Sequence, residues 1–360
     1  MKKSKIIWSI FLVIQVVLLK IVSFFPEVIE KYYSNGFYLS VSKISRTVFG
    51  SLPFSVGDVL YLVLIIFLLY KLYKKRKEVL SWKSWKSDWK SKTLSILASI
   101  SIFYFFFNCL WGLNYHRIPL YAKMGIDKEY TLEELEAFTK KMIVKTNEIH
   151  SRIVKNDSSQ VVSPYDIKTI YVMTLSGYGN LEKKHPYFNY QIPSIKKSMV
   201  SLPLTYMGFG GYLNPFTNEA QVNYKIPKYN FPTTVCHEMA HQIGYASESE
   251  ANFIGYLASI NNKDDYFRYS GYSYALKYCL SNLEKIQEGK SKEFLPLIHP
   301  GILKDFQETK DFWKSYQTPV DTFFHYFYDH FLKINQQKDG LESYSKFVGL
   351  MIGYYKNHPL

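Results

Sequence analysis

Long apolar stretches are confined to the first third of the chain, where they predict membrane-spanning helices. Three stretches, at about 6–25, 59–73 and 94–112, approach the roughly 20 apolar residues that cross a bilayer. Lys20 interrupts the first stretch, but a lysine near a helix end can extend its charged group to the membrane surface. We therefore predict a membrane domain over residues 1–113 with three transmembrane helices.

The first apolar stretch could instead belong to a cleaved signal peptide. The residues after it, Phe24-Phe25-Pro26-Glu27, lack the small side chains that a signal peptidase site requires. We therefore favour a helix that is retained in the mature protein.

The segments between the apolar stretches differ in positive charge, and this difference predicts the orientation. Residues 71–92 contain nine Lys and Arg, whereas residues 26–58 contain only three. Because basic segments beside membrane helices stay in the cytoplasm, we expect 71–92 to be cytoplasmic and everything after about residue 114 to lie outside. These features predict a multi-pass protein of the cytoplasmic membrane with an extracytoplasmic C-terminal domain.

Tryptophan and lysine alternate between the second and third apolar stretches. Trp82, Trp85 and Trp89 have the spacing of one helical face, and lysines lie between them. This composition suits the headgroup layer of an anionic bilayer. Such a basic aromatic segment can also bind nucleic acid, but its position between two membrane spans argues against that partner. The segment also accounts for part of the formal net charge of +14.

Residues 114–360 have the pattern of one α-rich α+β domain. Thr131 and Glu134 have the spacing of a capping box that opens a helix over 132–154. Residues 250–260 and several later segments also have a helical pattern.

Two other segments of this domain predict strands. Residues 165–176 have the composition of a short strand, and residues 201–224, rich in Gly, Tyr and Pro, indicate strands and turns rather than helix. The residues that follow this segment have a helical pattern described below. A strand just before that helix can pair with an extended peptide, or it can simply support the helix, and the sequence leaves both interpretations open.

The strongest chemical signal is His237-Glu-Met-Ala-His241, an HExxH motif. Residues four apart lie on one face of a helix, so His237 and His241 can direct ring nitrogens at one metal ion. Glu238 then lies beside the ion, where its carboxylate can take a proton from water. The alternative is a surface helix with two solvated histidines.

The residues around the motif indicate a short helix. Pro232 and the candidate N-caps Thr233 and Thr234 precede the histidines, and Gly244 suits the left-handed residue that ends a helix. Cys236 adjoins His237, but neighbouring positions of a helix point apart, so we interpret Cys236 as a packed thiol. The three cysteines of the chain do not indicate a disulfide framework.

A catalytic zinc site needs a third protein ligand and an open fourth position. Glu248 is our candidate because zinc peptidases with this signature often carry a Glu on a second helix, with Asp or Asn four residues later, and Asn252 has that place. Glu250 is the rival candidate, although Ser247 and Glu250 also have the spacing of a capping box. Ser247 stands where metzincins have a third histidine, which argues against that group.

No tyrosine can be singled out as an oxyanion donor, because the chain has 32 of them. Tyr245, Tyr269 and Tyr272 are candidates without a supporting pattern, and Glu219 is another acidic candidate that no spacing supports.

Several segments together resemble a known family. They are Trp111-Gly-Leu-Asn-Tyr115-His-Arg-Ile-Pro-Leu120, Pro215-Phe-Thr-Asn-Glu219-Ala, His237-Glu-Met-Ala-His241-Gln-Ile-Gly244, Glu248-Ser-Glu250-Ala-Asn252-Phe253 and Tyr269-Ser-Gly-Tyr272. The chain resembles, over nearly its whole length, an uncharacterised bacterial membrane family, domain of unknown function 3810. The resemblance implies a membrane-anchored, peptidase-like zinc domain. The segment from Glu248 to Asn252 also resembles the second zinc helix of gluzincin peptidases, where Asp is commoner than Asn.

The sequence therefore predicts a zincin-like metallopeptidase domain over 114–360. We expect Zn²⁺ on His237, His241 and Glu248, Glu238 as the catalytic base, and a peptide or protein substrate. Two alternatives stay open: a non-catalytic membrane scaffold whose metal site is structural, and a zinc amidohydrolase with a cell-envelope substrate.

Overall fold

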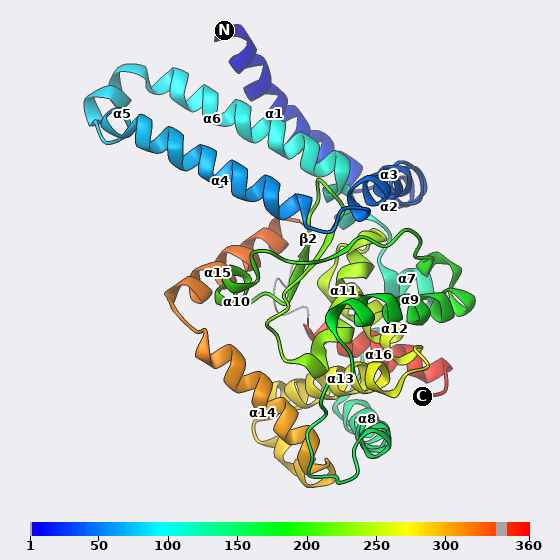
Figure 1. The fold of residues 1–360 in the computed structure, drawn as a ribbon. Helices are drawn as coiled ribbons and strands as arrows, with labels where there is room; N and C mark the ends of the chain where they lie inside the picture. Colours follow the sequence, from blue (N-terminus) through cyan, green and yellow to red (C-terminus); the bar gives the residue numbers. More distant parts are fainter. Residues whose placement is uncertain (1, 336–343) are drawn as a thin grey trace. The chain divides into compact units, whose positions relative to one another are not determined.

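The computed structural model describes residues 2–335 and 344–360, and the described chain is predominantly helical, with 73% of residues in helices. It divides into two compact units, Met1–Ile118 with Asn214–Glu219, and Pro119–Leu213 with Ala220–Leu360. The first unit thus takes one short segment from far along the sequence. Figure 1 follows the chain from the N-terminus through both units.

The first unit contains three helices that are long and apolar enough to cross a membrane. They are α1 (Lys2–Val22), α4 (Val56–Lys74) and α6 (Trp82–Leu110). Most of their apolar side chains are exposed, as expected of surfaces that face lipid. The predicted apolar helices are confirmed, although the first ends at Val22, a few residues earlier than predicted.

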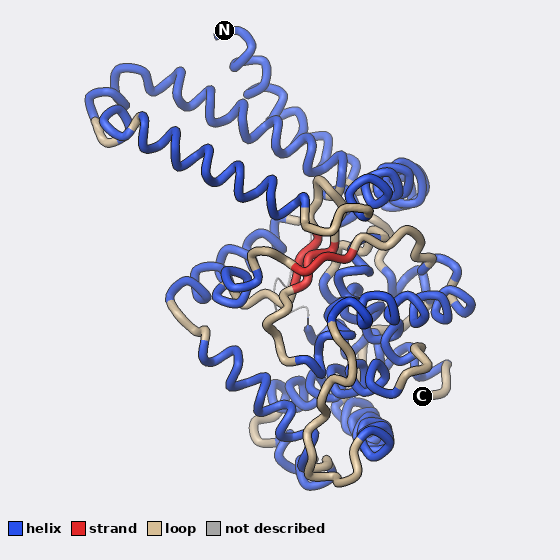
Figure 2. Tube along the Cα trace, viewed as in Figure 1, coloured by secondary structure: helices blue, strands red, loops and turns tan. Residues whose placement is uncertain are grey.

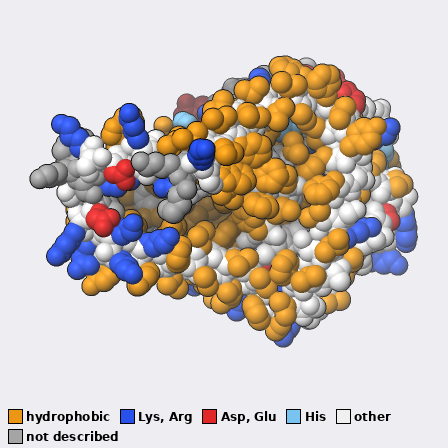
Figure 3. Space-filling model, turned by 90° about the horizontal axis from the view of Figure 1, so that it is seen from above, with side chains coloured by type: hydrophobic (Ala, Val, Ile, Leu, Met, Phe, Trp, Pro, Cys, Tyr) orange, Lys and Arg blue, Asp and Glu red, His pale blue; other side chains and the backbone are white. Residues whose placement is uncertain are grey.

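Shorter helices connect these three. They are α2 (Pro26–Val28), the π-helix η1 (Ile29–Phe37), α3 (Tyr38–Gly50), α5 (Arg76–Val79) and the 3₁₀-helix η2 (Gly112–His116). Asp88 has non-helical dihedral angles (φ −135°, ψ 28°), which interrupts α6 between Trp85 and Trp89. The three tryptophans therefore do not lie on one uninterrupted helix. Lys and Arg side chains gather at the end of the unit that contains α5 (Figure 3).

Buried polar contacts also stabilise the first unit. Arg117 and Glu30 form a bidentate pair with two contacts of 2.7 Å. The Glu219 carboxylate accepts hydrogen bonds from the amides of Val56 (3.1 Å) and Gly57 (2.6 Å), where an anion is favoured at the start of α4. The segment 214–219 is thus anchored to the start of α4, and Glu219 caps this helix.

The second unit is built from helices around a small sheet (Figure 2). Its longer helices are α8 (Leu132–Ile153), α9 (Ile167–Lys184), α11 (Phe231–Gln242), α12 (Glu248–Ile260), α13 (Asp265–Ile286), α14 (Pro300–Ser315), α15 (Pro319–Ile334) and α16 (Tyr344–Asn357). Two short helices, α7 (Leu120–Met124) and α10 (Ser201–Tyr206), and the 3₁₀-helices η3 (Pro186–Phe188), η4 (Lys228–Asn230), η5 (Lys290–Glu293) and η6 (Leu295–Leu297) complete the unit.

The sheet has the strand order β1-β3-β2, with β1 (Ile195–Lys197) parallel and β2 (Gly211–Leu213) antiparallel to β3 (Ala220–Val222). β2 therefore forms one edge of this sheet. The strands predicted within 201–224 are present, but the same segment also contains helix α10, so the prediction of no helix there is wrong.

Two predicted elements of the second unit have opposite outcomes. Helix α8 is confirmed, and both hydrogen bonds of its capping box form between Thr131 and Glu134 (3.0 and 3.2 Å). The strand predicted over 165–176 is wrong, because this segment belongs to α9. The Asp166 side chain accepts from the amide of Thr169 (2.8 Å) and opens the helix, a local signal that outweighs the β-branched composition.

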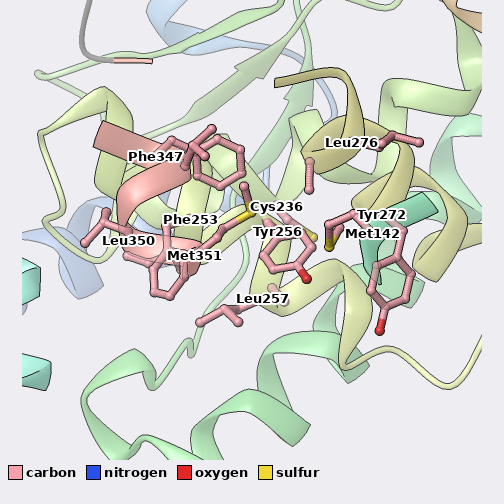
Figure 4. Packing of buried hydrophobic residues seen from close by; sticks show 14 of the residues in the cluster. Met142, Cys236, Phe253, Tyr256, Leu257, Tyr272, Leu276, Phe347, Leu350 and Met351 are labelled. Atoms are coloured by element: carbon pink, nitrogen blue, oxygen red, sulfur yellow. The ribbon is translucent and has the colours of Figure 1, made fainter. Parts of the chain in front are cut away.

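The core of the second unit lies where α8, α11, α12, α13 and α16 meet. Figure 4 shows Met142, Phe253, Tyr256, Leu276 and Phe347 packed there, each from a different helix except the two on α12. Burial of α12 on several sides fixes the position of its first turn, which carries Glu248.

Candidate metal centre

The HExxH motif lies on α11, a short buried helix that ends soon after the second histidine. Pro232 is in its first turn, and Gly244 follows it with φ of 89°, a conformation that glycine adopts without strain. The short helix and its glycine stop are confirmed. The predicted threonine N-caps are wrong, because Asn230 takes that position and Thr233 and Thr234 lie inside the helix.

The two histidines direct their Nε2 atoms at each other. His241 Nδ1 lies 2.7 Å from the carbonyl oxygen of Tyr245, so Nδ1 carries the proton and donates it. The Nε2 atom of His241 then carries a lone pair, and it lies 3.1 Å from Nε2 of His237. A backbone carbonyl that orients a ring in this way is a common feature of histidine metal ligands.

The Glu248 carboxylate joins the two histidines from the start of α12. Its oxygens lie 3.3 Å from Nε2 of His237 and 3.6 Å from Nε2 of His241. Gly255 makes this approach possible, since a Cβ there would lie 2.9 Å from the backbone nitrogen of His237. Tyr328 on α15 donates a hydrogen bond of 2.7 Å to Glu248 and fixes the carboxylate.

The donor atoms of these three side chains have about the separations that a tetrahedral ion needs, with Oε2 of Glu248 nearer to His237 and Oε1 nearer to His241. Metal–nitrogen and metal–oxygen bonds of roughly 2.0–2.1 Å place neighbouring ligand atoms about 3.3–3.4 Å apart. The observed separations of 3.1, 3.3 and 3.6 Å scatter around that value. Two imidazoles and a carboxylate are also a donor set that zinc accepts, so the residues present fit a zinc ion.

Glu250 points away from the histidines. Its carboxylate accepts a hydrogen bond of 2.6 Å from the amide of Leu120, the first residue of α7. Ser247 is the N-cap of α12, but its side chain makes no capping hydrogen bond, so the predicted capping box does not form. Of the two rival carboxylates, Glu248 lies beside the histidines, and Glu250 binds the first residue of α7.

Asn252, one turn after Glu248, lies near His237 but is engaged elsewhere. Its side-chain oxygen accepts a hydrogen bond of 2.7 Å from Tyr274. Among the described residues, Nδ1 of His237 is buried without a hydrogen-bond partner. Asn252 therefore has the expected place one turn after Glu248 but does not hydrogen-bond Nδ1 of His237.

Glu238 lies one residue after His237, against strand β2. Gly211 allows this position, since a Cβ on it would lie 2.5 Å from Oε1 of Glu238. Among the described residues, Oε2 of Glu238 is buried and accepts no hydrogen bond. Burial raises the pKa of Glu238 to about 8, so the carboxylate behaves as a proton acceptor of higher affinity than an exposed glutamate.

The pKa values of His241, Glu248 and His237 depend on burial and on the neighbouring groups. Burial lowers the pKa of His241 to about 4, and this keeps the ring neutral. Burial opposes the ionised form of Glu248, but hydrogen bonding from His237 and the two nearby histidines lower its pKa to about 2. Burial also opposes protonation of His237, yet contact with Glu248, assisted by Glu238 and Asn252, raises its pKa overall. The result is an ionised carboxylate beside two imidazoles.

The remaining sequence candidates have packing roles. Cys236 is buried, its thiol pKa is raised to about 12 by burial, and the chain's three cysteines are unpaired with one another. Tyr269 donates to Asp305 (2.5 Å). Sequence reasoning did not find Tyr328, which is one tyrosine among 32, or Gly211. Gly255 had a weak signal, since glycine inside a helix marks a close approach.

Comparison with protein-family models identifies a family. A family model described as "Protein of unknown function (DUF3810)" covers residues 33–352, and the chain therefore belongs to this family. The matched range contains all four residues of the His237, Glu238, His241 and Glu248 group. No curated protein and no solved structure matches the chain.

Proposed function

We propose that this DUF3810 protein is a membrane-anchored zinc metallopeptidase with a zincin-like second unit. The observation that supports this proposal most directly is the meeting of His237, His241 and Glu248 at tetrahedral separations. Glu238 lies on α11 with the two histidines, and its Oε2 atom, which has no hydrogen-bond partner among the described residues, could accept a hydrogen bond from a water molecule.

The chemistry follows from the positions of these residues. A bound zinc ion would lower the pKa of a water molecule and polarise the carbonyl of the substrate. Glu238 accepts the proton of the attacking water and then passes it to the leaving nitrogen. Its position supports this role, because Glu238 adjoins a candidate ligand and its buried Oε2 atom has no hydrogen-bond partner among the described residues.

Strand β2 supports a peptide as the substrate. It forms an edge of the sheet and runs past Glu238 at Gly211, so a chain that paired with this edge would pass the candidate metal ligands. Backbone pairing at a strand edge binds extended peptides with little dependence on their side chains.

The orientation in the membrane is part of the same proposal. The helices of the first unit indicate association with a lipid bilayer. The nine basic residues of 71–92 favour a cytoplasmic loop between α4 and α6, with the second unit outside the cytoplasm. In a bacterium, this arrangement would expose the site to substrates of the cell envelope from a position in the inner membrane.

The structural-site alternative requires a side chain that closes the fourth position. That side chain could be Glu250 or another residue. The engagement of Glu250 with the Leu120 amide argues against Glu250, whereas Glu238 has a carboxylate oxygen within 4.8 Å of a ligand atom of each histidine. An amide substrate from the cell wall or a lipid remains the second candidate class, because the same three ligands and one base also serve amidohydrolysis.

The test is Glu238→Gln in the full-length protein. Because this substitution removes the proton acceptor and keeps the volume, we expect peptide cleavage to fall by about 10²–10⁴-fold or more, with zinc content unchanged. Cleavage is compared across a whole bacterial proteome and a set of cell-wall and lipid amides, with zinc measured by elemental analysis.

Glu250→Gln is the matched control, since it changes a buried glutamate that we assign to packing, and it should retain both zinc and cleavage. Equal cleavage rates for Glu238→Gln and wild type would refute the mechanism. Cleavage of amides alone would retain the mechanism and change the substrate.

A further inference from the structure

A second group of metal-binding side chains lies at the other end of the same unit. His150 is in the last turn of α8, Asp157 is in the loop that follows, and His299 directly precedes α14. One ligand atom from each lies within 4.8 Å of the other two. Neither the motif analysis nor the family description assigns a role to these residues.

The Nδ1 atoms of the two histidines face each other. They are 3.3 Å apart, and Nδ1 of His299 is 3.4 Å from Oδ1 of Asp157. These separations equal the roughly 3.3–3.4 Å between neighbouring ligands of a tetrahedral ion with bonds of about 2.0–2.1 Å. A hydrogen bond between two nitrogens is also satisfied at this distance, so geometry alone leaves two interpretations.

The second contact of His150 leaves its Nδ1 atom able to bind a metal. Its Nε2 atom lies 2.9 Å from the carbonyl oxygen of Ser159, so Nε2 carries the proton of the neutral ring. The lone pair is then on Nδ1, the atom that faces His299. A ring nitrogen held by a backbone carbonyl while the other nitrogen is free to bind is the usual arrangement of a histidine ligand.

The backbone around the group holds it in place. The amide of Gly301 donates to the carbonyl of Asp157 (2.8 Å), and a Cβ on Gly301 would lie 2.1 Å from the carbonyl oxygen of Ser159. The Asn147 side chain accepts from the amide of His299 (3.1 Å) and donates to the carbonyl of Leu297 (2.8 Å). The loop, the end of α8 and the start of α14 are therefore fixed before any ion binds.

We propose that His150, Asp157 and His299 bind a second divalent transition-metal ion. Two imidazoles and one carboxylate suit zinc, with a fourth position open to solvent beside the partly exposed Asp157 and His299. The ion replaces the proton between the two Nδ1 atoms and joins α8, the loop after it and α14. No glutamate or aspartate with an orphaned oxygen adjoins this group among the described residues, so its role is to hold the fold rather than to catalyse.

The test is the zinc stoichiometry of the full-length protein in detergent, measured by equilibrium dialysis and elemental analysis. We expect wild type to bind two equivalents, and His299→Gln and Asp157→Asn to bind one. A variant with both His237 and His241 changed to Ala isolates the second group, so it should bind one equivalent, and adding His299→Gln should remove it.

His325→Gln is the matched control, because His325 is an exposed histidine 3.0 Å from Asp321 on α15. It should leave two equivalents bound. Asp157→Asn keeps the test decisive if a histidine variant fails to fold, since the Asp157 side chain is more than half exposed. One equivalent in wild type, unaffected by His299→Gln and Asp157→Asn, would overturn the proposal. Because cleavage is not measured, this outcome is independent of the proposed peptidase activity.

Discussion

The two histidine groups of the second unit use the same donor types in different surroundings. In the first, His237, His241 and Glu248 come from two packed helices, and the carboxylate side chain is 19% exposed. In the second, the carboxylate comes from a loop, and the Asp157 side chain is 57% exposed. Among the described residues, Glu238 places a buried carboxylate oxygen without a hydrogen-bond partner beside the first group, whereas Asp305, the buried carboxylate on α14, is held by hydrogen bonds from Tyr269 and the Val161 amide. The comparison teaches that an adjacent proton acceptor, rather than the ligand set, separates a site suited to catalysis from one suited to holding a fold.

Removing a histidine from the first group should have the largest effect. His241→Ala deletes one candidate ligand and the hydrogen bond to Tyr245, so we expect zinc affinity at this site to fall by more than the roughly 100-fold that follows loss of an indirect partner. Cleavage should disappear with the metal. Zinc binding and cleavage are measured together, and His299→Gln should leave cleavage intact. Loss of cleavage in His299→Gln as well would mean that the two groups do not have separate roles.

The next test displaces the Glu238 side chain without changing any of the three candidate metal ligands. A Cβ at residue 211 would lie 2.5 Å from Oε1 of Glu238 and 2.7 Å from the carbonyl oxygen of Gln221, so Gly211→Ala must move the base or the strand. We expect cleavage to fall by about 100-fold, the effect of misplacing a reacting group by about 1 Å, with zinc content unchanged. Gly179→Ala in α9 is the control, because a Cβ there meets no atom within 4 Å. Unchanged cleavage in Gly211→Ala would argue against Glu238 as the base.

The stability of the second unit should depend on pH through Asp305 on α14, the helix that begins directly after His299. Burial raises the pKa of Asp305 to about 6, although hydrogen bonds from Tyr269, the Val161 amide and Gln160 favour the ionised form, and nearby Glu308 adds to the rise. The folded-state value lies above the unfolded value of 3.8, so the stabilising contribution is complete below pH 3.8 and is lost as the pH rises through about 6. The loss is on the order of 2–3 kcal/mol.

Asp305→Asn should remove this pH dependence, because the amide does not ionise. Thermal unfolding of wild type and variant between pH 4 and 7 measures the difference, which should grow in favour of the variant as the pH rises. Asp311→Asn, on the exposed face of the same helix, is the control and should follow wild type. A wild-type and Asp305→Asn difference that stays constant with pH would contradict the assignment.

The smallest effect concerns the hydroxyl groups that orient each carboxylate. Tyr328 donates to Glu248 (2.7 Å), and Ser151 donates to Asp157 (3.1 Å). Tyr328→Phe should weaken zinc at the first site by about 10-fold, the lower end of the effect of an indirect partner. Ser151→Ala should change zinc binding at the second group less, since this bond is exposed to solvent. Competitive zinc titration measures both, and a larger effect from Ser151→Ala would reverse the comparison.

The sequence predicted those parts of the molecule that local signals determine. The capping box of Thr131 and Glu134, the glycine stop at Gly244 and the apolar helices all depend on residues close together in the chain. The strand predicted over 165–176 was wrong because its composition favours a strand while Asp166 starts a helix. Local signals also brought His237 and His241 together, since their spacing places them on one face of α11.

The rest required contacts between distant segments. Glu248 and Glu250 differ by two positions, and only the packing of α12 directs the first at the histidines and the second at Leu120. Tyr328 is separated from Glu248 by 80 positions, and His299 from His150 by 149, so no spacing pattern connects them. Gly211 matters because the Glu238 side chain, from α11, lies against β2 at this residue. The sequence of the strand alone does not reveal that contact.

The capping of α4 by Glu219 also has a practical consequence for expression of the protein in pieces. Glu219 is fully buried, and its carboxylate is satisfied by the amides of Val56 and Gly57. A water-soluble fragment that starts near residue 119 would keep this acid and its hydrogen bond from the Thr217 hydroxyl but discard the two backbone donors, and an ionised group that loses hydrogen bonds is costly to bury. Removal of the anchor is therefore not a neutral truncation, and purification for enzymology should begin from the intact polypeptide in detergent or lipid.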